Sequence, residues 1–210
     1  MPLHLHRGQK LVALDGSMHN ARLKRYLRDE KKVGDWQWEQ NPFTGKRELT
    51  GLRVMMGFIN NWDLKDDNNA VYEERREGSD PERIYMVSDL GASFGTPGLT
   101  WPLKRTRGNL GTYQHSKFIA KVTPSYVDLR TPARASLYFL ATPREYRIRL
   151  RLRWIGKHIP REDVRWIGQL LTRVSPDQIR DAFRAAGYPP EEVEGFTKVI
   201  QGRIAELDDL

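Results

Sequence analysis

The chain has 210 residues, no cysteine and a formal net charge of +8 at pH 7. This length allows one domain, or one domain with a small appendage, and the absence of cysteine excludes disulfides, thiolate nucleophiles and cysteine–zinc sites. A hydrophobic content of 39% argues against wholesale disorder, and the basic balance favours an acidic partner, whether nucleotide phosphates, nucleic acid or an anionic membrane.

The opening sequence MPLHLHRGQK has no apolar core long enough for a signal peptide. No later window has the length and hydropathy of a membrane span. We therefore expect a soluble cytoplasmic protein with no membrane span, provided that the chain lacks no N-terminal part.

Residues 1–45 contain few signals of regular structure. Leu11–Leu14 is a short strand candidate, and the basic segment 17–32 is predicted to be a short exposed helix or an ordered loop. Trp36 and Trp38 alternate with polar residues, and we expect them to hold this segment against the core.

A helix is predicted from about residue 46 to residue 61, because apolar residues recur at steps of three and four. Thr44 is its expected N-cap. Gly51 and Gly57 lower the helix propensity, so close packing is expected to hold the helix in place. The apolar positions are Leu49, Leu52, Met55, Met56, Ile59 and Trp62.

The helix leads into the polar loop Asp63-Leu64-Lys65-Asp66-Asp67-Asn68. Two short β-favouring runs follow, at 70–73 and 84–88, and we expect them to pair as a hairpin with a long turn. Pairing would bring Asp63, Asn68 and Asp89 to one end of the hairpin. Other polar residues of this loop are expected to be solvated rather than ligands, namely Asp66, Asp67 and Asn69.

The middle of the chain gives mixed signals. The segment 92–111 shows no period and is expected to be a functional or mobile loop, whereas 118–122 and 126–129 are predicted to form a strand pair. The run 137–141 is too short for periodicity to decide.

The sequence YRIRLRLRW at 146–154 alternates strictly between apolar residues and arginines, which predicts a strand with a buried apolar face. Four arginines on the other face could follow a nucleic-acid backbone. We favour a solvated face that protects an edge strand, because no aromatic residue interleaves with the arginines on that face. Nucleic acid is therefore an unlikely partner.

The last third of the chain is predicted to be a bundle of three helices that braces the central loop. The first follows Pro160, the second begins at a capping box on Ser175 and ends at Gly187, and the third begins near Pro190.

The polar residues around the hairpin combine the groups that phosphoryl chemistry requires. An aspartate at a helix exit can accept a proton or orient a nucleophile, while an asparagine and a second aspartate supply oxygens to a hard cation. A magnesium ion held in this way would bind polyphosphate. Each of these residues alone is typical of a cap or a turn, so the interpretation depends on their combination.

The pattern Asp63-x-Lys65-x-x-Asn68 resembles the catalytic loop of atypical protein-kinase-like and phosphatidylinositol-kinase-like phosphotransferases. Asp89-Leu90-Gly91 resembles their metal-binding DFG segment, with Leu in place of Phe. The phrases NNWDLKD and SDLGASFG also resemble those of an uncharacterised bacterial family, over most of the chain from about Asp15 onward.

The resemblance implies an α+β fold: a mainly helical domain like a kinase C-terminal lobe, with short β-hairpins, at residues 46–210. Residues 1–45 would be an N-terminal extension or the remnant of an N-terminal lobe. ATP would be the phosphoryl donor and Mg²⁺ the metal.

The resemblance also implies a role for each site residue. Asp63 would orient or deprotonate the acceptor hydroxyl, and Lys65 would steady the transferring phosphoryl group. Asn68 and Asp89 would hold magnesium.

Two departures from the kinase pattern limit the resemblance. Asn61 and Trp62 stand where a His-Arg pair precedes the catalytic aspartate, and residues 1–51 contain no glycine-rich loop followed by a strand lysine and a helix glutamate. The nucleotide-clamping lobe could lie in an upstream part of a longer protein, could come from a partner chain, or could be lost together with activity; we favour the first.

We therefore expect magnesium-dependent phosphoryl transfer from a nucleotide. The alternative is a non-catalytic, pseudokinase-like module that binds an acidic partner or nucleic acid.

Overall fold

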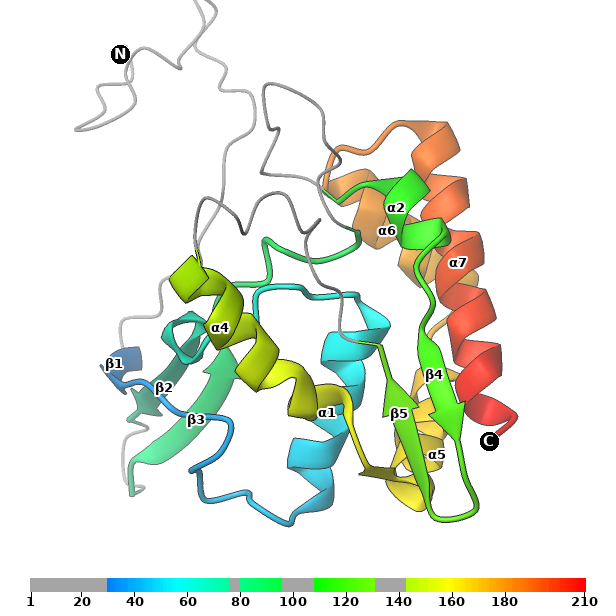
Figure 1. Cartoon of the computed structure of the whole chain (residues 1–210). Coiled ribbons are helices and arrows are strands. Elements are labelled where there is room, and N and C mark those ends of the chain that lie inside the picture. Colours follow the sequence, from blue (N-terminus) through cyan, green and yellow to red (C-terminus); the bar gives the residue numbers. More distant parts are fainter. Residues whose placement is uncertain (1–29, 76–79, 96–107, 131–142) are drawn as a thin grey trace, which may run out of the picture.

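The computed structural model of the chain describes residues 30–75, 80–95, 108–130 and 143–210 (Figure 1). Within these residues it contains six α-helices and two three-stranded antiparallel sheets, which confirms the predicted α+β class with short hairpins. None of the described helices has the length and hydropathy that crossing a bilayer requires. The expected strand at Leu11–Leu14 and the run at 137–141 lie outside the described residues, as does most of the 92–111 loop.

The first sheet contains the predicted hairpin. Strands β2 (Asn69–Glu74) and β3 (Glu82–Val87) pair antiparallel, with Asn69 opposite Val87. Strand β1 (Glu30–Gly34) adds to the other edge of β2, in the order β1-β2-β3. The described end of the basic segment is thus a strand, and the prediction of a helix or loop is wrong for it.

Helix α1 (Arg47–Phe58) is the predicted central helix. Its N-cap is Lys46 without a side-chain cap, so the prediction for Thr44 is wrong. Thr44 lies in the preceding turn, where its hydroxyl donates to the Asn41 carbonyl, because Gly45 at φ +79° separates that turn from the helix.

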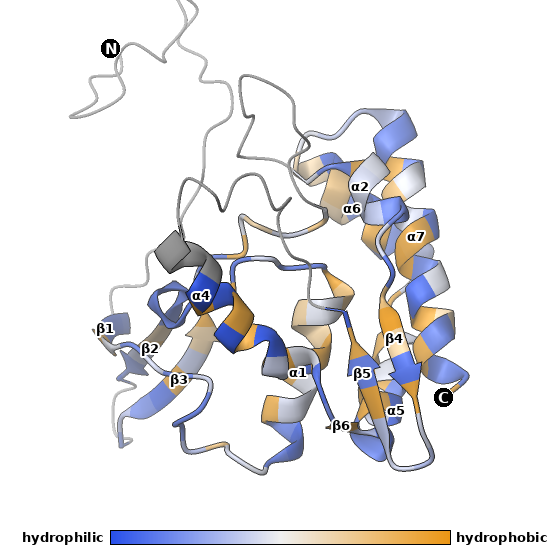
Figure 2. Cartoon of the chain, viewed as in Figure 1, coloured by the Kyte–Doolittle hydropathy of each residue, from blue (hydrophilic) through white to orange (hydrophobic). Residues whose placement is uncertain are grey.

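The second sheet packs close to α1. It contains β4 (Ile119–Val122), β5 (Tyr126–Leu129) and the short β6 (Ile159–Pro160), in that order, and the predicted pairing of β4 with β5 is confirmed. A Cβ on Gly57 of α1 would lie 3.0 Å from Leu129 Cδ1. The glycine therefore lets α1 and β5 pack closely, as expected from the sequence. Much of β4 and β5 is orange in Figure 2, the colour of hydrophobic residues.

The arginine-rich segment 146–154 is not a strand. It forms helix α4 (Pro143–Arg151), followed by the 3₁₀-helix η3 (Leu152–Gly156), and this prediction is wrong. A short helix α2 (Leu110–Gln114) precedes the second sheet.

The same residues also satisfy a helical pattern, which explains the error. Ile148, Leu152 and Ile155 are separated by four and three residues, and all three contribute to the core. Arginine and leucine are also good helix formers. Figure 2 shows the described part of α4 as blue and orange segments in alternation.

Three helices form the predicted C-terminal bundle: α5 (Arg161–Leu171), α6 (Pro176–Ala185) and α7 (Pro190–Asp208). The capping box at Ser175 is confirmed, and Gly187 has the left-handed φ of +76° expected after a helix end. Helix α7 contacts both α5 and α6, and in Figure 1 it lies beside β4.

The contact between α5 and α7 depends on Gly168, which predicts a substitution effect. A Cβ at this position would lie 2.9 Å from Leu207 Cβ and 3.0 Å from the Leu207 carbonyl oxygen. Because the backbone of α7 cannot move aside cheaply, we expect Gly168→Ala to lower the free energy of unfolding by about 1–3 kcal/mol. Urea denaturation measures this change.

Gly202→Ala is the matched control for Gly168→Ala. Gly202 lies inside α7, and a Cβ there meets nothing within 4 Å. We expect this variant to gain roughly 0.5–1 kcal/mol, because alanine has the higher helix propensity. A Gly168→Ala protein as stable as the control variant would contradict the close approach of the two helices.

Arg203 of α7 joins the bundle to the end of α1. Its side chain is only 3% exposed, and it donates to the Phe58 carbonyl at 2.6 Å and to Ser116 Oγ at 2.6 Å. The guanidinium lies 4.1 Å from the Tyr113 ring centroid. Burial lowers the pKa of Arg203, but an arginine stays protonated.

The Tyr113 hydroxyl reinforces the same attachment. Burial raises the pKa of Tyr113 to about 12, although nearby Arg203 opposes the shift. The phenol therefore stays protonated and donates to the Phe58 carbonyl at 2.8 Å. The last turn of α1, from which the polar loop leaves, is fixed by two donors from other elements.

Candidate functional site

The polar loop begins with a sharp turn at the end of α1. Asn60 has a left-handed φ of +55°, and Asn61 is fully buried. Asn61 Oδ1 accepts a hydrogen bond from the Asp63 amide at 2.8 Å. Asn61 was seen in the sequence only as a departure from the kinase pattern, but it fixes the backbone of the candidate catalytic aspartate.

Asn68 closes the loop back onto Asp63. The Asn68 side-chain amide donates to the Asp63 carbonyl at 2.7 Å, and the Asn68 backbone amide donates to the Lys65 carbonyl at 3.0 Å. The 3₁₀-helix η2 (Asp66–Asn68) forms the end of this loop.

Asn68 also contacts the strand end that carries Asp89. Its carbonyl accepts hydrogen bonds from the Ser88 amide at 2.7 Å, the Ser88 hydroxyl at 2.9 Å and the Asp89 amide at 3.3 Å. Asp89 Oδ1 accepts from the Gly91 amide at 2.9 Å. The structure therefore places the backbones of Asp63, Asn68 and Asp89 close together, with Asn68 hydrogen-bonded to the Asp63 carbonyl and to the Asp89 amide.

Two cations lie beside the Asp63 carboxylate. Arg149 Nη2 is 3.3 Å from Asp63 Oδ1, and Lys65 Nζ is 3.8 Å from the same oxygen. The three side chains are 20% (Asp63), 12% (Arg149) and 23% (Lys65) exposed, so water screens the charges only partly. Arg149 comes from α4, and it was missed in the sequence because the strand prediction placed it on a solvated face.

The two N-terminal tryptophans pack in the core, as predicted, and their backbones contact the polar loop. Trp36 and Trp38 are both buried, and their rings meet edge to face at 4.8 Å. The Trp38 amide donates to Asp66 Oδ1 at 3.1 Å, and Asn69 donates to the Trp36 carbonyl at 3.1 Å. Asn69 is therefore buried rather than solvated, so that prediction is wrong. The Asp66 carboxylate accepts a hydrogen bond from a backbone amide.

The segment after Asp89 returns to the end of α1. The Trp62 amide donates to the Ala92 carbonyl at 3.1 Å, and the Phe94 amide donates to the Ile59 carbonyl at 2.6 Å. Phe94 has a φ of +60°, and its ring contacts the rings of Tyr113, Phe183 and Phe196. The phrases NNWDLKD and SDLGASFG thus form one bonded unit that is anchored in the helical bundle.

Asn68 and Asp89 carry oxygen donors of the kind that magnesium prefers. An amide oxygen and a carboxylate are hard oxygen ligands, and Mg²⁺ is usually held by one or two protein groups, with water and phosphate oxygens completing its shell. The described residues contain no cluster of three or more His, Cys, Asp or Glu side chains that could form a fuller metal cage. A magnesium ion held by Asn68 and Asp89 would need water and phosphate oxygens for the rest of its shell.

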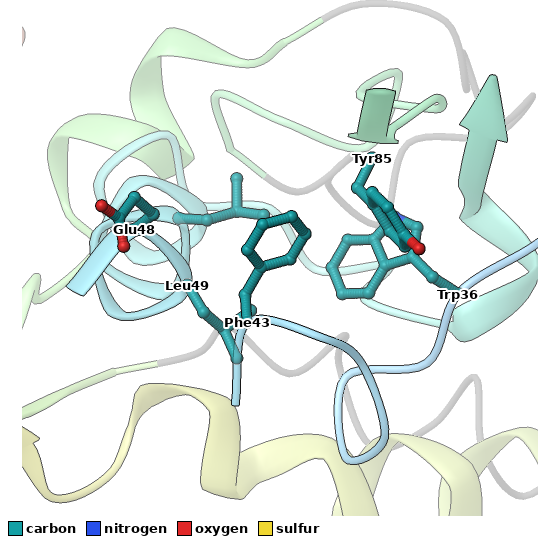
Figure 3. A pocket seen from close by; sticks show the side chains of 6 residues that line it. Trp36, Phe43, Glu48, Leu49 and Tyr85 are labelled. Carbon is teal, nitrogen blue, oxygen red and sulfur yellow. The ribbon is translucent and has the colours of Figure 1, made fainter. Parts of the chain in front are cut away.

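An apolar pocket lies between α1, β3 and the loop that follows β1 (Figure 3). Its volume is about 140 Å³, which is smaller than the ~300–1,000 Å³ typical of pockets for drug-sized ligands. The Phe43 ring meets that of Tyr85 edge to face at 5.1 Å. We do not assign a nucleotide to this pocket, which is lined by Trp36, Phe43, Glu48, Leu49, Leu52 and Tyr85.

Comparison with known proteins adds no further assignment. No protein-family model matches the sequence, and no curated protein or solved structure is detectably similar to the chain.

Proposed function

We propose that the chain is an atypical kinase-like phosphotransferase that transfers a phosphoryl group from ATP in a magnesium-dependent reaction. The observation that carries the proposal is the bonding of Asn68 to both Asp63 and Asp89. Two acidic residues separated in the sequence are thereby joined by a residue that itself offers a metal ligand. A cytoplasmic location forms part of the same proposal.

Asp63 has the role of proton acceptor. Its carboxylate takes the proton of an acceptor hydroxyl while the hydroxyl oxygen forms a bond to the γ-phosphorus of ATP. The bond between that phosphorus and the oxygen bridging to the β-phosphate breaks, and ADP leaves with the electron pair. Lys65, close to Asp63, is placed to steady the charge on the transferring group.

Asn68 and Asp89 are the residues that would hold magnesium. A bound magnesium ion supplies positive charge that neutralises the phosphate oxygens. An upstream lobe or a partner chain that clamps the nucleotide would strengthen binding, but the proposal requires the chain itself to bind ATP with magnesium and to turn it over.

Nucleotide binding should depend on Asp89. With saturating ATP and magnesium, we expect the wild-type chain to gain roughly 2.7 kcal/mol of stability at 100 times the dissociation constant. We expect Asp89→Ala to lose most of this gain, because one of the two magnesium ligands is removed. Thermal unfolding with ATP, measured with magnesium and with EDTA, provides the test.

Asp67→Ala is the control for this experiment. Asp67 is an exposed acidic residue of the neighbouring η2 turn, so its removal changes the net charge equally. We expect it to retain the ATP-dependent stabilisation. A stabilisation that is independent of magnesium, or equal in Asp89→Ala, would contradict the proposed metal site.

The second candidate function is a non-catalytic module that binds an acidic partner. It is favoured by the net charge of +8. Such binding would be salt-sensitive. Binding of inorganic polyphosphate that weakens with salt and is indifferent to Asp89→Ala, in a chain that ATP and magnesium do not stabilise, would favour this function instead.

A further inference from the structure

We propose that Arg149 is a positioning residue for Asp63 in the phosphoryl transfer, an inference that rests on the proposed function. Arg149 is not part of the kinase-like motif, and it reaches the loop from a helix 87 residues away in sequence from Trp62. Its side chain contacts both the backbone and the carboxylate of the loop at the candidate catalytic position.

The contacts of Arg149 define the orientation of the carboxylate. Nη1 donates to the Trp62 carbonyl at 2.7 Å, while Nη2 lies 3.3 Å from Asp63 Oδ1. The guanidinium also lies 4.9 Å from the centroid of the Trp62 ring. A planar guanidinium that contacts two adjacent residues at once ties the direction of the Asp63 side chain to the path of the backbone.

The helix that carries Arg149 is anchored in the core. Helix α4 continues into η3, whose Leu152 and Ile155 are buried in the core. Arg53 of α1 donates to the Ile155 carbonyl at 2.8 Å and to the Lys157 carbonyl at 2.6 Å. Helix α1 therefore holds both the polar loop and the element that carries Arg149, which fixes their relative position.

This arrangement has a specific kinetic consequence. A proton acceptor must meet the acceptor hydroxyl at hydrogen-bond distance and in the correct direction. Arg149 does not contribute a metal ligand, so its loss should affect the turnover step rather than the binding of ATP. Loss of a residue that served only to stabilise the fold would not lower the turnover rate while leaving ATP binding unchanged.

The test compares Arg149→Met with Arg147→Met in the full chain, using ATP and magnesium. Arg147 lies on the same helix and is exposed, so it is a matched control for the loss of one charge from α4. For Arg149→Met we expect kcat to fall about 100-fold, because misplacement of a catalytic group costs this much, while KM for ATP changes by less than about twofold. For Arg147→Met we expect both constants to remain at the wild-type values.

Arg149→Lys separates the effect of the double guanidinium contact from the effect of the positive charge. Lysine keeps one positive charge near Asp63 but cannot contact both the carboxylate and the Trp62 carbonyl in the same way. We expect a kcat between those of the wild type and Arg149→Met. If Arg149→Met fails to fold, Arg149→Lys decides alone, and a wild-type kcat in this variant overturns the proposal.

The outcomes separate this inference from the function on which it rests. A wild-type chain that neither binds ATP with magnesium nor turns it over overturns both. A wild-type chain that turns ATP over, with Arg149→Met unchanged in kcat or with KM raised in proportion to the loss of kcat, overturns only the role of Arg149.

Discussion

Replacing Arg203 by methionine should destabilise the protein by about 3 kcal/mol, because several buried carbonyl groups lose a charged donor at once. The guanidinium donates to Phe58, Tyr113 and Ser116. Methionine fills a similar volume but supplies no donor. The variant no longer bears the desolvation cost of a buried guanidinium, which reduces the loss of stability. It does not cancel the loss, because the carbonyl groups stay buried without this donor.

Urea unfolding of Arg203→Met measures this effect, with Arg184→Met as the control. Arg184 is an exposed residue of α6 that pairs with Asp181 at 2.7 Å. An exposed pair of this kind contributes about 0–1 kcal/mol. If the two variants lost equal stability, Arg203 would not be the attachment between α7 and the end of α1.

The elements predicted correctly from the sequence are those with local chemical signals. The capping box at Ser175 and the glycine at position 187 specify both ends of α6 without reference to the rest of the chain. The hairpin of β2 and β3 was predicted because both runs favour strands and a long turn separates them.

The segment 146–154 shows what local signals cannot decide. Its alternation satisfies a strand, but Ile148, Leu152 and Ile155 also share one face of a helix. The choice depends on tertiary contacts, since the second sheet is completed by β6 and α1 binds the carbonyls of η3 through Arg53. A segment without caps or a turn signal gives no local means of choosing.

The residues of the candidate site also divide into those that a local motif identifies and those that tertiary packing places. Asp63, Lys65, Asn68 and Asp89 could be named from the motif, since they lie in two short phrases of sequence. Arg149 could not be named, because its place beside Asp63 depends on how α4 packs. The buried state of Asn69 likewise follows from the loop at Trp36, which is distant in sequence.

Asp63→Asn should reduce phosphoryl transfer by about 100- to 10,000-fold, the range expected for loss of a proton acceptor. The change preserves size, and the hydrogen bonds that Asp63 makes through its backbone to Asn61 and Asn68 do not involve the carboxylate. We therefore expect the loop to keep its shape and ATP with magnesium to bind as before. Single-turnover transfer measured beside ATP-dependent thermal stabilisation separates the two effects.

The charges around Asp63 make stability a second readout of this substitution. Asparagine leaves Arg149 and Lys65 without the carboxylate between them, which should cost about 1–2 kcal/mol for a half-buried charged contact. Adding Arg149→Met to Asp63→Asn should recover part of that loss, since the two effects share one interaction. If transfer stays at the wild-type rate while stability falls, Asp63 is a structural partner of Arg149, and the proton acceptor must be sought elsewhere.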